Sequence, residues 1–275
     1  MEASAGPSAP SPPRDPRLFP LRASGTRPPL FLVAAPGVNA LGYTGLARGL
    51  AADQPVYVVQ PQGKDLTFAP LGAGTRGAFM AVAAGYVEAI RTVGGEGPYV
   101  LGGTGHGANI AFQMARLLEA AGDRVALLAI VETFPLEDMP VHARLLANVA
   151  ARRWQRASRA ELWAELRRRA AGALDELRAP GSGRWPGEGW VSPILRAPIA
   201  VLLADARSVR GDDALGWRAH TSGEVVVRTV ACGREDLLRK PHVRSLARAL
   251  EDVLAPTRST SASTGPGVAG FMGRR

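Results

Sequence analysis

The sequence predicts an α/β fold with a mostly parallel, doubly wound sheet. Short apolar runs recur along the chain, and the stretches between them have the apolar spacing of helices. The chain has 275 residues, of which 46% are hydrophobic and 21% are charged. That composition supplies enough apolar material for one large core or two small ones.

Six apolar runs are expected to form buried strands, because a strand covered on both faces is continuously hydrophobic rather than alternating. They lie at 30–35, 56–60, 99–102, 126–132, 199–205 and 225–231. Helical spacing is found at 76–93 and at 108–121, each between two of these runs. This alternation of strand and helix predicts parallel pairing.

The interval 133–198 is too long for a single crossover. It contains two helical segments, at about 141–157 and 159–178, and is interpreted as an inserted helical lid at about 137–190. Its many arginines are expected to form a solvated face, with docking of an acidic partner as the functional alternative. Residues 1–28 and 257–275 are rich in Pro, Ser, Thr or Gly and are expected to be disordered, which leaves one domain at 29–256.

Composition excludes several classes of protein. The single cysteine, Cys232, has no partner for an internal disulfide, and no apolar run approaches the roughly 20 residues of a membrane span. The net charge of +9 comes almost entirely from arginine, and aromatic residues make up only 6% of the chain, so we expect no nucleic-acid partner. Without an apolar leader at residues 1–28, the expected location is cytoplasmic.

A glycine-rich turn after the strand at 99–102 fits two motifs. Gly103 and Gly107 occupy the flanking positions of a nucleophile elbow, G-x-S-x-G, in which a tight strand-to-helix turn presents a nucleophile. The central position is Gly105, which has no side chain. Gly103, Gly105 and Ala108 also satisfy the dinucleotide fingerprint G-x-G-x-x-A, with Glu132 at the end of the next strand. The residues alone leave both interpretations open.

A family resemblance favours the elbow. The segments PLFLVAAPGVNALGYTGLARGL, EGPYVLGGTGHGANIAFQMARLLEAAGDRVALLAIVETFP and LLRKPHVRSLARAL occur in this order within 29–256. They resemble thioesterases, of the type II or excised terminal type, of polyketide and nonribosomal peptide assembly lines. The resemblance implies an α/β-hydrolase fold with a helical lid. It also implies release of acyl chains from a carrier protein.

The catalytic triad implied by the resemblance is degenerate. The nucleophilic serine of the family falls on Gly105, its acid on Glu132, and its histidine on Arg234. Asp205 is an alternative acid position. One backbone donor of the oxyanion hole falls on Pro36, which has no N–H, whereas the N–H of His106 remains. Serine-dependent hydrolysis is therefore not the expected reaction.

His106, directly after the vacant nucleophile position, is the best remaining acid/base candidate, and packing against the lid is its structural alternative. Glu132 can orient it, and Arg234 can bind an enolate or a carboxylate. The expected substrate contacts, with helix capping and packing as alternatives for two of them, are Pro36, Asn39, Tyr43 and Thr104.

The other histidines and the cysteine are given structural interpretations. His142 and His220 are expected at the surface, His242 at the start of the last helix, and Cys232 as a buried structural residue rather than a displaced nucleophile. No spacing among them predicts a metal site, and no cofactor is expected.

Three functions remain from sequence. The first is an enzyme that carries out a non-hydrolytic step, such as cyclisation or isomerisation, on an acyl or peptidyl intermediate, whether free or bound to a carrier protein. The second is a catalytically silent protein that binds a carrier protein or an intermediate. The third is an NAD(P)-binding oxidoreductase that uses the glycine-rich turn.

Overall fold

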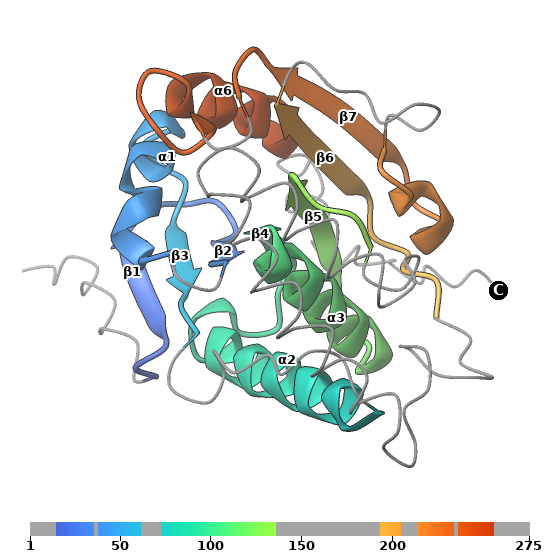
Figure 1. Cartoon of the computed structure of the whole chain (residues 1–275). Coiled ribbons are helices and arrows are strands. Elements are labelled where there is room, and N and C mark those ends of the chain that lie inside the picture. The colour runs from blue at the N-terminus through green and yellow to red at the C-terminus, as the bar shows by residue number, and fades with distance from the viewer. Residues whose placement is uncertain are drawn as a thin grey trace, which may run out of the picture.

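The computed structural model describes residues 15–35, 38–61, 73–135, 193–204, 214–233 and 236–255. These residues form one seven-stranded sheet in the order β1-β3-β2-β4-β5-β6-β7 (Figure 1). Its strands are β1 (Leu18–Arg22), β2 (Leu30–Val33), β3 (Val56–Val59), β4 (Tyr99–Thr104), β5 (Val125–Val131), β6 (Ile199–Ala204) and β7 (Val225–Val230). The helices are η1 (Ala40–Tyr43), α1 (Thr44–Gly49), α2 (Ala73–Gly94), α3 (His106–Ala120), η4 (Trp217–His220) and α6 (Val243–Leu254).

The six strands expected from apolar runs are confirmed, and they pair in parallel from β3 to β7. Helices α2 and α3 confirm the two helical segments to within a few residues. Every residue of β2, β3 and β5 is buried, because helices cover both faces of the sheet. The lid expected at about 137–190 lies outside the described residues.

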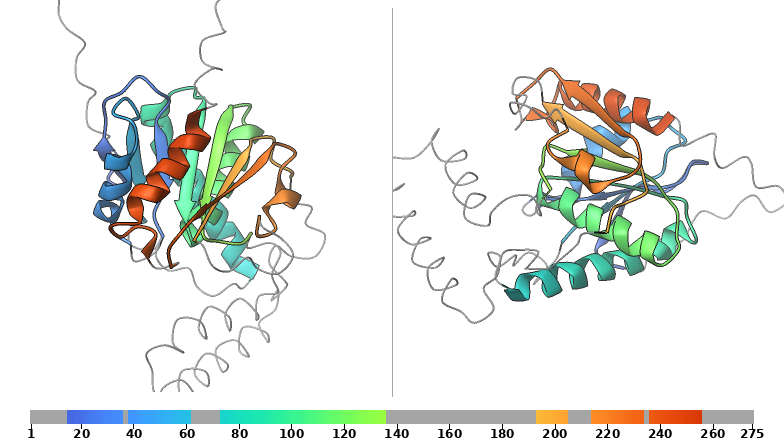
Figure 2. Two further views of the ribbon diagram at one scale, coloured as in Figure 1. Left: turned by 90° about the horizontal axis from the view of Figure 1, so that it is seen from above. Right: turned by 90° about the vertical axis from the view of Figure 1, so that its right-hand side faces the viewer.

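Two apolar layers sandwich the sheet. The side chains of α2 and α3 share one core cluster with Phe31 of β2 and Leu101 of β4. The side chains of α1 and α6 share the other cluster with Leu32 and Val100 from the same two strands. Figure 2 shows α6 crossing the sheet on the face opposite α2 and α3. The neighbouring strands β2 and β4 therefore lie deep between both layers.

The expectation that residues 1–28 are disordered is wrong for residues 15–28. Residues 18–22 form β1, an antiparallel edge strand paired with β3. Only Leu18 of this strand is buried, so its sequence carries neither a continuous apolar run nor a clear alternation. Pro20 is compatible with an edge position, where its missing N–H costs little.

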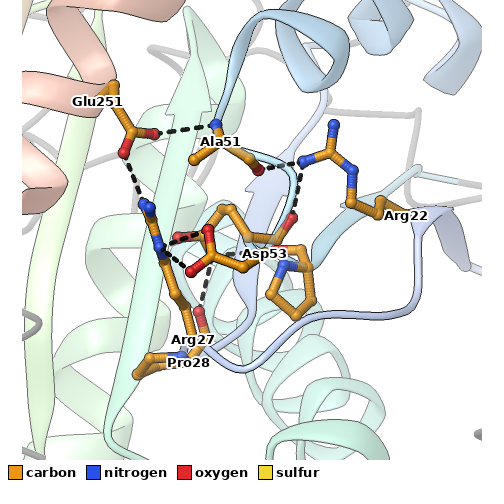
Figure 3. Close-up of polar contacts among 8 residues, drawn as sticks. Arg22, Arg27, Pro28, Ala51, Asp53 and Glu251 are labelled. Carbon is orange, nitrogen blue, oxygen red and sulfur yellow. Dashed lines mark hydrogen bonds and ion pairs between the residues drawn. The ribbon is translucent and has the colours of Figure 1, made fainter.

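A charged network ties the residues before β2 to the last helix (Figure 3). The guanidinium of Arg27, only 13% exposed, pairs with Asp53 at 2.9 Å and with Glu251 of α6 at 2.5 Å. The second carboxylate oxygen of Glu251 accepts the N–H of Ala51 at 3.2 Å. Arg22 donates to the carbonyl oxygens of Ala47 and Ala51 at the end of α1. The network therefore fixes α6 at the edge of the sheet where the parallel strands begin.

Replacement of Glu251 by alanine removes two hydrogen bonds and leaves the partly buried charge of Arg27 with one partner fewer. We expect Glu251→Ala to lower the free energy of unfolding by about 2 kcal/mol. The matched control is Asp252→Ala, an exposed position next to it on α6, which should change that free energy by less than about 0.5 kcal/mol. Urea titration measures both, and equal losses would contradict a stabilising role for the network.

Candidate functional site

The candidate site is the turn that joins β4 to α3. Gly105 stands between the last residue of β4 and the first residue of α3, with φ 52° and ψ −125°. Its N–H donates to the carbonyl oxygen of Val131 at 3.1 Å, and its own carbonyl oxygen accepts the N–H of Ala108 at 3.1 Å. A side chain at this position would project from a sharp turn at the carboxyl edge of a central strand. This is the geometry of a nucleophile elbow.

The two flanking glycines are required by close packing, whereas Gly105 is not. A Cβ at Gly103 would lie 2.5 Å from the backbone nitrogen of Ala108, and one at Gly107 would overlap the carbonyl oxygen of Val33 in β2. A Cβ at Gly105 would meet nothing nearer than the Cβ of Ala35, at 3.9 Å. The turn therefore has room for a side chain that the sequence does not provide. This arrangement favours the elbow over the dinucleotide fingerprint.

The structure describes two of the three residues proposed as catalytic from sequence. His106 is exposed as the first residue of α3. Glu132 follows β5 with a φ of 54°, an unfavourable value for a residue with a side chain. The carboxylate of Glu132 accepts the N–H of Ala204 at the end of β6. Both residues lie at the carboxyl edge of the sheet, and Arg234 lies outside the described residues.

Asn109 and Trp217 hold the loop that follows Glu132, and sequence reasoning did not find either of them. Asn109 of α3, only 3% exposed, donates to Thr133 Oγ1 at 3.3 Å and to the carbonyl oxygen of Phe134 at 3.1 Å. The indole N–H of Trp217 donates to the carbonyl oxygen of Thr133 at 2.8 Å. A buried amide needs hydrogen-bond partners, so an asparagine in the first turn of α3 was the available signal for this contact.

His220 is not at the surface, contrary to the expectation from sequence. Its ring lies edge-on to Phe112 of α3 and to Trp217, with centroid separations of 5.7 and 5.9 Å. It is 7% exposed, because η4 packs against the same core cluster as α3. His142 lies outside the described residues, and His242 directly precedes α6 as expected.

The expected substrate contacts differ in their surroundings. The Oδ1 of Asn39 accepts the N–H of Leu41 at 2.8 Å, so the side chain caps η1. Tyr43 is fully buried, and its hydroxyl lies 2.5 Å from Thr104 Oγ1. Burial raises the pKa of the Tyr43 phenol above its ordinary value. Pro36 lies outside the described residues.

Cys232 is half-buried against the α6 side of the core, and not fully buried as expected. The acid candidate Asp205 lies outside the described residues. A cavity of about 660 Å³ lies at the amino ends of β5, β6 and β7, at the edge of the sheet opposite the elbow.

Within the described ranges, no group of three His, Cys, Asp or Glu residues could hold a metal ion. Among the described residues, no helix is both long enough and apolar enough to cross a membrane.

The glycine contacts predict different effects of the same substitution at two neighbouring positions. Gly105→Ala adds a methyl group that makes only an ordinary contact with the Cβ of Ala35, at 3.9 Å. The substitution strains only the backbone, so it should lower the free energy of unfolding by about 1–2 kcal/mol. Gly107→Ala forces α3 away from β2 and should cost about 3 kcal/mol or more. Thermal and urea unfolding of both variants measures the difference. A Gly107→Ala protein as stable as Gly105→Ala would refute the packing explanation.

Two curated proteins and two solved structures illustrate the similarity of the chain to known proteins. It is 35% identical over 128 residues to a dimodular nonribosomal peptide synthase of Bacillus subtilis and 37% identical over 120 residues to a chondramide synthase of Chondromyces crocatus. These segments cover 45% and 43% of this chain but only 5% and 3% of the synthases.

Among solved structures, the NocB thioesterase domain in covalent complex with a fluorophosphonate nocardicin G analogue is 27% identical, with a TM-score of 0.58. The alignment covers 86% of this chain and 99% of that domain. The Vlm2 thioesterase domain bound with a dodecadepsipeptide has the same fold at 23% identity and a TM-score of 0.57, covering 86% of this chain and 97% of that one.

A family model described as a thioesterase domain matches residues 28–254. That range contains the sheet from β2 to β7, the elbow and α6. The protein therefore belongs to the thioesterase-domain family, with the fold of the α/β-hydrolase-type thioesterases found in nonribosomal peptide and polyketide synthesis.

Proposed function

We propose that this protein acts in polyketide or nonribosomal peptide biosynthesis and catalyses a non-hydrolytic step on an acyl or peptidyl intermediate. The step is cyclisation or isomerisation, including epimerisation, by acid/base chemistry. The observation that carries the proposal is Gly105, which occupies an elbow with the geometry and the space for a nucleophile but has no side chain.

An elbow without a side chain cannot form the acyl-enzyme intermediate of a serine-dependent thioesterase. The amino end of α3 still lies at the turn, where the partial positive charge of the helix favours a developing negative charge. The site can therefore bind a carbonyl group and stabilise an enolate or an oxyanion without becoming acylated. Cyclisation then needs an attacking group within the substrate, and epimerisation needs only proton transfer next to the carbonyl.

His106 is the proposed acid and base. Its imidazole is exposed beside Gly105, and imidazole exchanges protons near neutral pH. Glu132, held at the same edge of the sheet by the amide of Ala204, is proposed to orient His106. Arg234, on the connection between β7 and α6, is the proposed anion-binding residue. Pro36 and Asn39, on the connection from β2 to η1, are proposed to contact the acyl chain.

The proposed partner is a carrier protein that presents the intermediate on its phosphopantetheine arm. The similarity to nonribosomal peptide synthases supports this partner. The second candidate is a catalytically silent protein that binds the carrier protein or the intermediate. The absence of a nucleophile at Gly105 is also compatible with this candidate.

Loss of His106 distinguishes the two candidates. His106→Ala should lower product formation in the reconstituted pathway by about 100-fold, the usual contribution of a general acid or base. The product inventory, measured by mass spectrometry, should show the intermediate accumulating. The control is Arg124→Ala, an exposed residue before β5 at the opposite edge of the sheet, which should retain full activity. Unchanged product formation in His106→Ala would leave only the binding function.

A further inference from the structure

Three polar groups from separate parts of the chain meet beside the vacant position at Gly105. The hydroxyl of Tyr43, at the end of η1, lies 2.5 Å from Thr104 Oγ1, at the end of β4. The same Tyr43 oxygen accepts the N–H of Ala35, which follows β2, at 3.4 Å. Ala35 also provides the nearest atom to a Cβ at Gly105. The cluster therefore ties the connection after β2 to the end of β4, directly before the elbow.

The chemistry of the three groups fixes the direction of one hydrogen bond and favours one direction for the other. The amide of Ala35 can only donate, so the oxygen of Tyr43 accepts there. A phenol is a stronger acid than an aliphatic alcohol, so Tyr43 is the better donor in its contact with Thr104. Burial raises the pKa of Tyr43 and keeps its proton in place over the whole neutral range. Thr104 Oγ1 therefore accepts from Tyr43, and its own hydrogen is directed elsewhere.

Burial indicates where that hydrogen points. Tyr43 is 0% exposed, whereas Thr104, the residue directly before Gly105, is only half-buried. Among the described residues, Tyr43 is the one side chain that hydrogen-bonds the Thr104 hydroxyl. On a half-buried residue, a hydroxyl that accepts a hydrogen bond from the core side can turn its own hydrogen toward the open side. Thr104 is the last residue of β4, so its exposed part lies at the carboxyl end of that strand, where a bound acyl group would lie.

We propose that the Thr104 hydroxyl donates a hydrogen bond to the carbonyl oxygen of the bound acyl thioester, and that Tyr43 positions it. This inference rests on the proposed function, because it presumes that an acyl group occupies the elbow. No covalent bond forms at Thr104. Its role is to polarise the carbonyl, which favours both removal of the neighbouring proton and attack by a group within the substrate.

The test uses an acyl-pantetheine analogue in which a CH₂ group replaces the thioester sulfur, with a ¹³C label at the carbonyl carbon. In complex with the wild-type protein, the infrared carbonyl stretch should lie at lower wavenumber than in Thr104→Val, which has the same shape without the hydroxyl. The affinity of Thr104→Val for the analogue should be about fivefold to tenfold lower. Thr104→Ser should restore the shift, because it restores the donor.

Tyr43→Phe tests the positioning role separately. It should reduce the carbonyl shift, but it should add nothing in the Thr104→Val background, because Tyr43 acts through Thr104. Tyr57→Phe is the matched control and should leave the shift unchanged, since the hydroxyl of Tyr57 faces the carbonyl oxygen of Ala23 at 3.5 Å.

The two possible failures are distinguishable. Binding of the analogue with the same carbonyl frequency in wild type and Thr104→Val would overturn the role of Thr104 and leave the proposed function standing. No binding of the analogue to the wild-type protein would overturn the proposed function, and this inference with it.

Discussion

The close approach of α3 to strands β2 and β4 is the constraint on which the site depends. Gly103 and Gly107 have no room for a Cβ, because backbone atoms of α3 and of β2 lie against them. A helix packed so closely behind the strand that precedes it can be reached only through a sharp turn, and Gly105 makes that turn with a positive φ. In the described residues this turn is present, and the position that it would present carries no side chain.

Contacts with several helices and strands hold the loops around the elbow in place. The loop after β5 is tied to α3 by Asn109 and to η4 by Trp217, while Glu132 is tied to β6. The loop after β2 is tied to β4 through Tyr43. A site supported in this way keeps its shape without the nucleophile, because none of these contacts passes through residue 105. A retained binding site with altered chemistry is a consistent interpretation of such a structure.

The sequence predicted the parallel strands well, because strands buried on both faces read as apolar runs. It missed β1, whose half-exposed edge position leaves no such pattern. It placed His220 at the surface, since nothing local indicates that η4 packs under α3. The elbow glycines could be recognised in the sequence as a motif, but the Tyr43–Thr104 contact could not be predicted from it. That contact joins residues 61 positions apart and depends on how η1 lies against β4.

The most direct test of a nucleophile-free elbow is the intact mass of the purified protein after incubation with a panel of acyl-pantetheine thioesters, with released thiol measured in parallel. We expect an unchanged protein mass and thiol release no faster than in buffer for acyl chains that have no internal nucleophile. An acyl adduct on the protein, with Cys232 as the first residue to examine, or rapid hydrolysis of simple acyl chains would contradict it.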